Sequence, residues 1–202
     1  MEKTSPRFSV PQAGFSAPRM LQTDLTTYDN AWYQPGSRWK VVLWFLISPL
    51  TINSYLPLPV AFKRGLLRGF GAKIGRGVVV KPHVNVKYPW FLEVGDYAWI
   101  GENVWIDNLA PVRIGHHACL SQGAMLLTGN HDYTRTSFDL RIAPITLEAG
   151  AWAGAKTLIG PGVVMGSHAV LAAGSVATTS LEPYGIYQGN PAQLIRKRGI
   201  TA

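Results

Sequence analysis

The feature of this 202-residue chain that most constrains its fold is a six-residue repeat. Aliphatic residues recur at every sixth position in four runs, and the spacing changes only between the runs. The positions are Ile74, Val80, Val86; Val94, Ile100, Ile106; Ile114, Leu120, Leu126; and Leu147, Ala153, Ile159, Met165, Leu171, Ala177. A period of six matches neither the turn of a helix nor the simple alternation of a strand.

A second column of residues supports the first. Small or β-branched residues follow most aliphatic positions by four: Val78, Val84, Ala98, Val104, Ala110, Ala118, Ala124, Ala151, Thr157, Val163, Ala169 and Ser175. Glycine often follows the aliphatic residue directly, as at Gly95, Gly101 and Gly115. This pattern predicts coils of three short strands, each with one aliphatic residue inward, stacked about 4.8 Å apart. The spacing does not fix the handedness, although general chirality rules favour right-handed crossovers.

The repeat divides the chain into three parts. Residues 1–69 are expected to form an N-terminal extension with a disordered start and a partly helical cap, 70–182 the β-helix, and 183–202 a C-terminal tail. The amphipathic segment 39–62 contains an apolar run, Val41–Ile47, which is far shorter than the roughly 20 residues of a membrane-spanning helix. Flanking cations are typical of a helix lying on an anionic membrane face, whereas the simpler interpretation is a cap packed on the domain end.

Composition narrows the partners and the compartment. A net charge of +8 predicts an anionic partner. Lys and Arg are spread along the chain rather than gathered on one element, so nucleic acid is not expected as a partner. Cys119 is the only cysteine, which excludes internal disulfides and cysteine-rich zinc sites, and we expect it to be a buried structural thiol. Because the first residues lack the apolar stretch of a secretory signal, we expect a cytoplasmic protein, with a membrane-peripheral location as an alternative.

Five short motifs resemble the hexapeptide acyltransferase superfamily, and within it the colanic-acid-biosynthesis acetyltransferase group. They are Phe70-Gly71-Ala72-Lys73-Ile74-Gly75, Tyr88-Pro89-Trp90, Gly95-Asp96-Tyr97-Ala98-Trp99, Gly129-Asn130-His131-Asp132 and Gly189-Asn190-Pro191-Ala192. The resemblance covers residues 38–198 and implies an all-β, left-handed parallel β-helix. It also implies a homotrimer with active sites between subunits. The implied reaction moves acetyl from acetyl-CoA to a sugar hydroxyl in exopolysaccharide biosynthesis.

The repeat is interrupted between Leu126 and Leu147, where residues 128–141 are polar, aromatic and charged and predict an excursion loop. A hydroxyl is barely acidic at neutral pH, so its acetylation calls for a base such as histidine. By resemblance, His131 in this loop matches the family's catalytic histidine. It would act as the general base while the acceptor hydroxyl attacks the thioester directly, so no covalent enzyme intermediate is needed. Asp132 or Asp139 is a candidate to orient the imidazole. For Asp132, a role in the loop's own turn is the preferred interpretation.

The resemblance also implies a donor site. The backbone N–H of Ala155 is the candidate oxyanion donor, although some relatives carry Ser at this position. The pantetheine arm of acetyl-CoA is expected near Trp152, Gly154, Ala155, Ala173 and Thr178.

Phosphate contacts are expected nearer the end of the chain. Arg196, Lys197 and Arg198 are candidates to hold the CoA phosphates through charge-assisted hydrogen bonds, with a solvated basic tail as the alternative. Relatives often carry Lys where Thr179 stands here, so one phosphate contact is expected to be absent.

For the acceptor, candidates lie at or beside two-residue insertions in the repeat. Tyr88 precedes one insertion, and Trp105, Asp107 and Asn108 surround the other. Aromatic, carboxylate and amide groups together suit the faces and hydroxyls of a sugar, and relatives place acceptor-binding acids or amides near here. Corner capping by the Asx side chains is the alternative.

The remaining histidines do not predict a metal site. His116 and His117 are adjacent and face opposite sides of a strand, while His83 and His168 occupy outward positions of the repeat. No metal is therefore expected. Three alternatives stay open: a serine acetyltransferase, a xenobiotic acetyltransferase, and a zinc-dependent protein similar to the gamma-class carbonic anhydrases, which bind zinc through three histidines.

Overall fold

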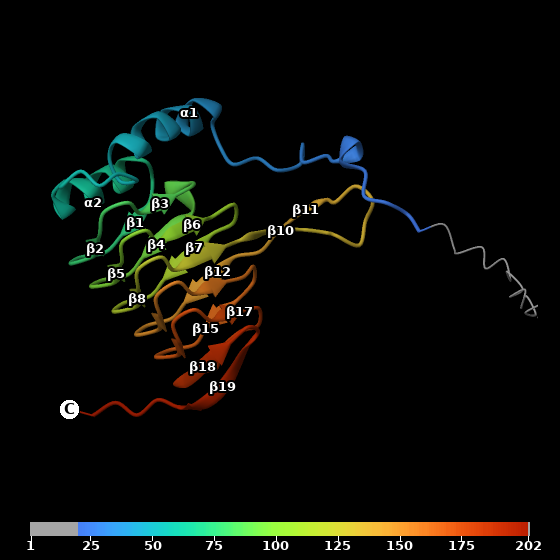
Figure 1. Cartoon of the computed structure of the whole chain (residues 1–202). Coiled ribbons are helices and arrows are strands. Elements are labelled where there is room, and N and C mark those ends of the chain that lie inside the picture. Colours follow the sequence, from blue (N-terminus) through green and yellow to red (C-terminus); the bar gives the residue numbers. More distant parts are fainter. Residues whose placement is uncertain (1–19, 202) are drawn as a thin grey trace, which may run out of the picture.

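The computed structural model describes residues 20–201. The expected disordered start of the chain falls largely in residues 1–19, outside the described residues. Residues 73–189 form a three-sided parallel β-helix, with helices covering one end and a hairpin closing the other (Figure 1). The predicted β-helix is therefore confirmed. No helix among residues 20–201 has the length and hydropathy that crossing a membrane requires.

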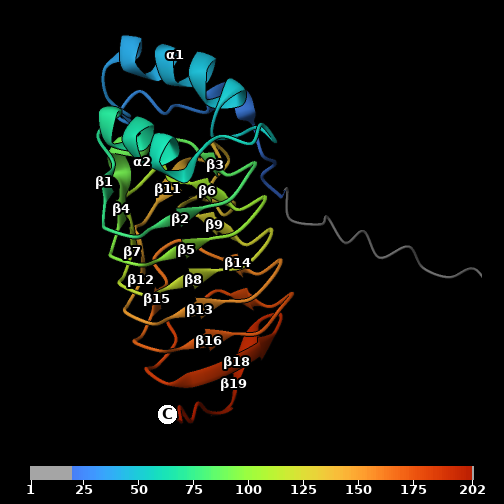
Figure 2. The ribbon, with the colours of Figure 1, turned by 90° about the vertical axis from the view of Figure 1, so that its left-hand side faces the viewer.

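Each side of the prism is a parallel sheet to which successive coils contribute one strand each, so the coils stack one above another (Figure 2). Sheet A consists of β1 (Lys73–Ile74), β4 (Leu92–Val94), β7 (Val112–Ile114), β12 (Ile145–Leu147) and β15 (Val164–Met165). Sheet B consists of β2 (Val79–Val80), β5 (Trp99–Ile100), β8 (Cys119–Leu120), β13 (Trp152–Ala153), β16 (Val170–Leu171), β18 (Gly185–Gly189) and the antiparallel β19 (Ala192–Lys197). Sheet C consists of β3 (Asn85–Val86), β6 (Trp105–Asp107), β9 (Met125–Leu127), β14 (Leu158–Ile159) and β17 (Val176–Ala177).

Both residue columns of the repeat form the core. All the aliphatic positions are buried, none of them more than 8% exposed, and so are the small residues that follow them by four. Ile100 pairs with Val80 in the coil before it and with Leu120 in the coil after it. Each coil therefore buries its aliphatic side chains against equivalent side chains above and below, as expected for a solenoid.

The glycines that follow the aliphatic residues have a steric cause. A Cβ on Gly101 would lie 2.8 Å from the carbonyl oxygen of Leu120, and a Cβ on Gly154 would lie 2.7 Å from the amide nitrogen of Ala173. The obstructing atoms belong to the backbone of the next coil, which cannot swing aside as a side chain can. Glycine at this position sets how closely consecutive coils approach.

The helical cap satisfies the backbone of the first coil, which has no earlier coil to pair with. It comprises α1 (Arg38–Ile47), the 3-10 helix η2 (Ser48–Leu50) and α2 (Val60–Gly69). Trp44 in α1 donates its indole N–H to a main-chain carbonyl of β3 at 2.8 Å. Lys63 and Arg68 of α2 donate to carbonyls of β2 and β1 at 3.4 and 2.7 Å. In the sequence, Lys63 and Arg68 are among the cations typical of a helix on an anionic membrane face. In the structure they cover the open edge of the first strands.

Three further segments depart from the regular coils. β10 (Gly129–His131) and β11 (Leu140–Ile142) form an antiparallel hairpin that projects from the prism at the predicted excursion (Figure 1). Within the predicted tail 183–202, the described residues 183–201 are not a simple tail, because β18 extends sheet B and β19 folds back on it. Residues 20–37, which we call the N-terminal arm, include the 3-10 helix η1 (Leu25–Thr27) and lead from the projecting hairpin to α1. A last 3-10 helix, η3 (Pro89–Phe91), lies between β3 and β4.

The coil spacing can be tested with two glycine-to-alanine substitutions. Gly101→Ala should lower stability by about 1–3 kcal/mol, because the added methyl group overpacks the space between coils. The matched control is Gly65→Ala in α2, where a Cβ meets no atom within 4 Å. That change should raise stability by about 0.5–1 kcal/mol through helix propensity. Urea unfolding followed by circular dichroism measures both, and a Gly101→Ala protein as stable as wild type would contradict the account.

Candidate active site

The predicted base and two predicted acceptor-binding residues lie around one pocket of about 510 Å³. Its walls come from four segments that are far apart in sequence. They are the arm (Tyr28, Asn30, Tyr33, Pro35), the residues after β3 (Lys87, Tyr88), the end of β6 (Asp107, Leu109) and the projecting hairpin (Gly129, Asn130, His131, Leu140). The pocket lies at the edge of the prism between sheets C and A, where the repeat is interrupted.

The imidazole of His131 is held in one orientation by the hairpin. Its Nδ1 lies 2.9 Å from the carbonyl oxygen of Phe138, and its ring stacks on the Phe138 ring at 4.4 Å between centroids. A carbonyl only accepts hydrogen bonds, so Nδ1 must carry the proton and Nε2 of the neutral ring is the free base. Phe138 adopts a φ of 53°, unusual for an aromatic residue, where the chain turns back toward β11.

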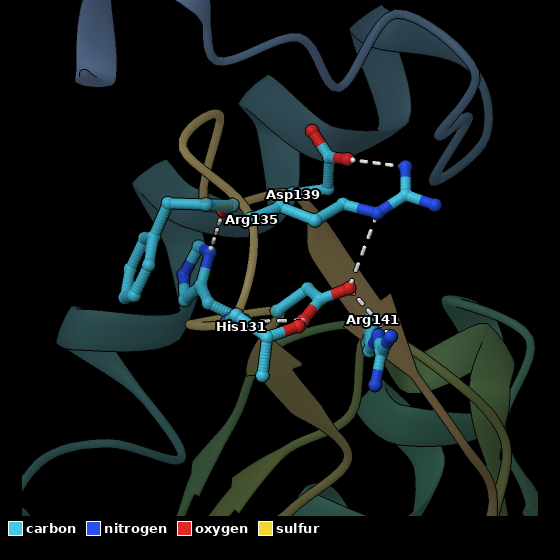
Figure 3. Close-up of polar contacts among 7 residues, drawn as sticks. His131, Arg135, Asp139 and Arg141 are labelled. Atoms are coloured by element: carbon cyan, nitrogen blue, oxygen red, sulfur yellow. Dashed lines mark hydrogen bonds and ion pairs between the residues drawn. The ribbon is translucent and has the colours of Figure 1, made fainter. Parts of the chain in front are cut away.

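Neither acidic candidate orients His131. The carboxylate of Asp132 accepts hydrogen bonds from the amide and hydroxyl of Thr134 and pairs with Arg141 and Arg135. The Thr134 hydroxyl is the main cause that lowers the pKa of Asp132 below its ordinary value. Asp139 pairs with Arg135 at 3.3 Å. The imidazole of His131 points away from these arginines (Figure 3), so Asp132 serves the hairpin's own turn, as preferred from the sequence.

The acceptor candidates divide into two groups. Asp107 lines the pocket and forms an ion pair with Lys87, whose Nζ lies 2.9 Å from the carboxylate. Tyr88 also lines the pocket, although most of its side chain is buried, and this burial raises the pKa of its phenol. Trp105 lies instead on the outer face of sheet C and is 42% exposed.

Asn108 does not face the pocket. Its side chain is fully buried, accepts a hydrogen bond from the amide of Tyr88 at 2.9 Å, and donates to the carbonyl of the same residue at 2.7 Å. Both ends of the amide are used to join two consecutive coils. The prediction that Asn108 binds an acceptor is therefore wrong, and the alternative of corner capping describes its role.

The donor-site candidates gather on a different part of the prism. Trp152 stands on the outer face of sheet B and donates its indole N–H to the hydroxyl of Ser121 at 2.9 Å. Gly154, Ala155 and Ala173 lie in the turns that lead from sheet B to sheet C. Thr178 follows β17 at the far end of sheet C and is exposed.

The turns from sheet B to sheet C carry a row of main-chain donors. Among residues 20–201, the N–H groups of Glu102, Gln122, Ala155 and Ala173 have no hydrogen-bond acceptor. At the turns from sheet A to sheet B, three of the equivalent N–H groups donate to side chains. The row therefore includes the predicted oxyanion donor and the next coil's equivalent.

The three cations predicted to bind the CoA phosphates differ in their contacts. Arg196 is exposed on β19. Lys197 pairs with Glu182 at 3.0 Å. Arg198 donates to the carbonyls of Gly150 and His168, which lie in the turns from sheet A to sheet B. The described contacts of Lys197 and Arg198 therefore hold the C-terminal segment on the prism, away from Ala155 and Ala173.

The other histidines and the cysteine lie in turns and strands of the β-helix rather than around the pocket. His83, His117 and His168 occupy turns at positive φ and stack on tyrosine rings at 4.6, 5.3 and 4.9 Å. In residues 20–201, no three His, Cys, Asp or Glu side chains are grouped so that they could hold a metal ion. Cys119 faces outward from sheet B and is partly exposed rather than buried as expected, and partial burial raises the pKa of its thiol.

Sequence reasoning missed four residues at this site. Lys87 precedes Asp107 by 20 residues, which is the length of that coil, so aligning the coils would have placed the two together. Phe138 acts through its main-chain carbonyl, for which the sequence carries no signal. Tyr28 and Asn30 lie in the arm, where no repeat guides prediction.

Comparison with known proteins agrees with this architecture, although no family model matches the chain. One relative is WcaF of Escherichia coli (strain K12), which is named as a colanic acid biosynthesis acetyltransferase. It is 38% identical over 170 residues, which cover 84% of this chain and 93% of WcaF. Galactoside O-acetyltransferase of Escherichia coli (strain K12) is 28% identical over 148 residues, 72% of this chain and 73% of that protein.

Solved structures show the same fold. The hexapeptide-repeat containing acetyltransferase VCA0836 of Vibrio cholerae superposes with a TM-score of 0.71 and 28% identity, covering 80% of this chain and 94% of that one. The structure of its complex with acetyl coenzyme A superposes with a TM-score of 0.67 and 29% identity. That superposition covers 73% of this chain and 81% of the other.

These relatives define the class of the protein as an acetyltransferase built on a β-helix. The chain belongs to the hexapeptide-repeat acetyltransferase family, and WcaF is similar to it along most of its length. The family membership sets aside the alternative of a zinc-dependent carbonic-anhydrase-like protein.

The buried carboxylate of Asp132 gives a prediction about pH. Its pKa is lowered in the folded state, so its stabilising effect is fully present above the unfolded-state pKa of about 3.9 and is lost as pH falls through the folded-state value. Asp132→Asn should therefore melt at a lower temperature than wild type at pH 7. The difference should shrink below about pH 4. Thermal unfolding at a series of pH values measures it, and a constant difference down to pH 3 would contradict the assigned role.

Proposed function

We propose that the protein transfers acetyl from acetyl-CoA to a hydroxyl of a sugar in exopolysaccharide biosynthesis, with His131 as general base. The observation that carries the proposal is the fixed tautomer of His131 in a pocket that also holds Asp107 and Lys87. The names of WcaF and galactoside O-acetyltransferase support a carbohydrate acceptor. The complex of VCA0836 supports acetyl-CoA as donor.

The proposed chemistry is a direct transfer. Nε2 of His131 removes the proton of the acceptor hydroxyl while its oxygen attacks the thioester carbonyl carbon. The negative charge that develops on the carbonyl oxygen is stabilised by the free N–H of Ala155. When the tetrahedral intermediate collapses, the C–S bond breaks, and the departing CoA sulfur takes the proton from Nε2. The products are the acetyl ester and free CoA, and no covalent enzyme intermediate forms.

A homotrimer with sites between subunits completes this arrangement. The hairpin of His131 leaves the edge between sheets C and A, whereas Ala155 and Ala173 lie on the edge between sheets B and C. A single prism presents these groups on different edges. In the proposed trimer, the hairpin of one subunit reaches the sheet B to sheet C edge of its neighbour, where Trp152, Thr178 and Arg196 also contact the donor.

The role of His131 can be tested by substituting it with asparagine. His131→Asn should lower the rate of acetyl transfer by about 10²–10⁴-fold, because the hydroxyl proton loses its acceptor. The matched control is His168→Asn, which changes an equally half-buried histidine at a turn remote from the pocket. Release of free CoA thiol from acetyl-CoA, measured with methyl glycosides and UDP-linked sugars, reports the rate.

The same assay separates the acceptor classes. Serine and chloramphenicol belong in the panel because serine and xenobiotic acceptors are the alternatives within the family. Turnover with these two and with no sugar would contradict the carbohydrate proposal. Undiminished turnover of His131→Asn would contradict the mechanism.

We also propose a cytoplasmic enzyme whose cap contacts the inner membrane face. Support comes from the exposed apolar side chains of α1, among them Trp39 at 83% and Leu46 at 65%, and from the net charge of +8. The full chain should co-sediment with vesicles containing phosphatidylglycerol and not with pure phosphatidylcholine. Trp39→Ser combined with Leu46→Ser should abolish binding, and retention of binding in this variant would contradict the proposal.

A further inference from the structure

The N-terminal arm is anchored on the molecule at both of its ends. Near its start, the amide of Asp24 donates to the carbonyl of Thr136 in the projecting hairpin at 2.8 Å. Near its end, the carbonyl of Pro35 accepts the indole N–H of Trp90 at 2.6 Å. The arm therefore spans from the hairpin that carries His131 to the coil that precedes β4.

A third anchor lies between these two. The hydroxyl of Tyr33 donates to the carbonyl of Leu109 at 2.8 Å, beside the strand that ends at Asp107. Burial and the nearby Asp107 both raise the pKa of Tyr33, so its phenol stays protonated and keeps this hydrogen bond. The residues between the anchors at positions 24 and 33 are consequently held beside the pocket, and Tyr28 and Asn30 among them line it.

Two residues in this stretch line the pocket without serving as anchors. The ring of Tyr28 lies 5.8 Å from the imidazole of His131 and is tilted 54° to it. Asn30 lines the same pocket and is exposed. Asp107, Lys87 and Tyr88 of the coils line the same pocket. An aromatic ring and an amide from the arm thus share this pocket with an ion pair and with the base.

We propose that the arm selects the acceptor, with Tyr28 and Asn30 as specificity-determining residues. This inference rests on the proposed sugar acetylation and identifies the residues that choose the sugar. Tyr28 offers an apolar face to the C–H side of a pyranose ring. The amide of Asn30 can donate to one hydroxyl and accept from its neighbour. Asp107 and Lys87 of the coils bind further hydroxyls, leaving one hydroxyl at Nε2 of His131.

This placement predicts discrimination between sugars that differ in one hydroxyl. A site built to hydrogen-bond a hydroxyl rejects an analogue that lacks it, because the polar groups of the site are then left without partners. The coils and the hairpin supply only part of the pocket's lining. The arm supplies the rest, and it does so outside the repeat, where its sequence is free to vary without disturbing coil stacking.

The test compares three single substitutions in the full-length protein. Tyr28→Ala and Asn30→Ala should each lower kcat/KM for methyl β-D-galactopyranoside, or for the best methyl glycoside of the panel, by about 10–200-fold. The KM for acetyl-CoA should stay within about twofold of wild type, because Ala155 and Ala173 of the proposed donor path lie on another edge of the prism. Leu25→Ala is the control, since this exposed arm residue does not line the pocket.

Each outcome distinguishes the arm from the reaction itself. Wild-type kcat/KM in both pocket variants would overturn the inference while leaving the sugar acetyltransferase intact. A matching loss in Leu25→Ala, or an equally raised KM for acetyl-CoA in all three variants, would also overturn it, since the arm would then only support the fold. If the wild-type protein acetylates no sugar of the panel, the proposed function fails and the inference fails with it.

Discussion

Stacking of one coil on the next is the interaction on which the rest of the structure depends. A single coil pairs none of its strands internally, so its backbone hydrogen bonds and its apolar side chains are satisfied only by the coils on either side. Both ends of such a stack would expose unpaired strands. Here the cationic side chains of Lys63 and Arg68 in α2 donate hydrogen bonds to the first coil, and the β18–β19 hairpin completes the last coil. The cap and the C-terminal hairpin are therefore requirements of the repeat.

The same stacking explains where the candidate active site lies. Consecutive coils place equivalent turns directly above one another, so insertions at one edge accumulate there. The turn that holds Lys87, the turn after Asp107 and the hairpin of His131 all occur between sheet C and sheet A, in three successive coils. A regular prism offers no concavity, whereas three stacked insertions with the arm across them enclose a pocket. The candidate site thus lies where the repeat is interrupted, on a scaffold made rigid by its regularity.

The sequence predicted what the repeat controls and missed what lies outside it. Six-residue spacing predicted the buried columns, and the break at residues 128–141 predicted the hairpin. Asn108 was misplaced because a two-residue insertion changes which side chains face inward, and the repeat does not say how. The carbonyl that fixes His131 belongs to the backbone, which any residue at position 138 would supply. The arm has no periodicity, so its approach to His131 could only be seen in the folded chain.

The central claim is that each proposed active site is shared between two subunits, and one measurement tests it directly. His131→Asn chains and Ala173→Trp chains, the latter with the proposed donor path blocked, should each form inactive trimers. In trimers co-expressed with different affinity tags and purified for both, His131 of one chain can serve the open donor path of the other. Acetyl transfer should then return to about a third of the wild-type rate, because every mixed ring of three has one interface that joins an intact His131 to an open donor path. Purified mixed trimers that remain inactive would contradict a site built between subunits.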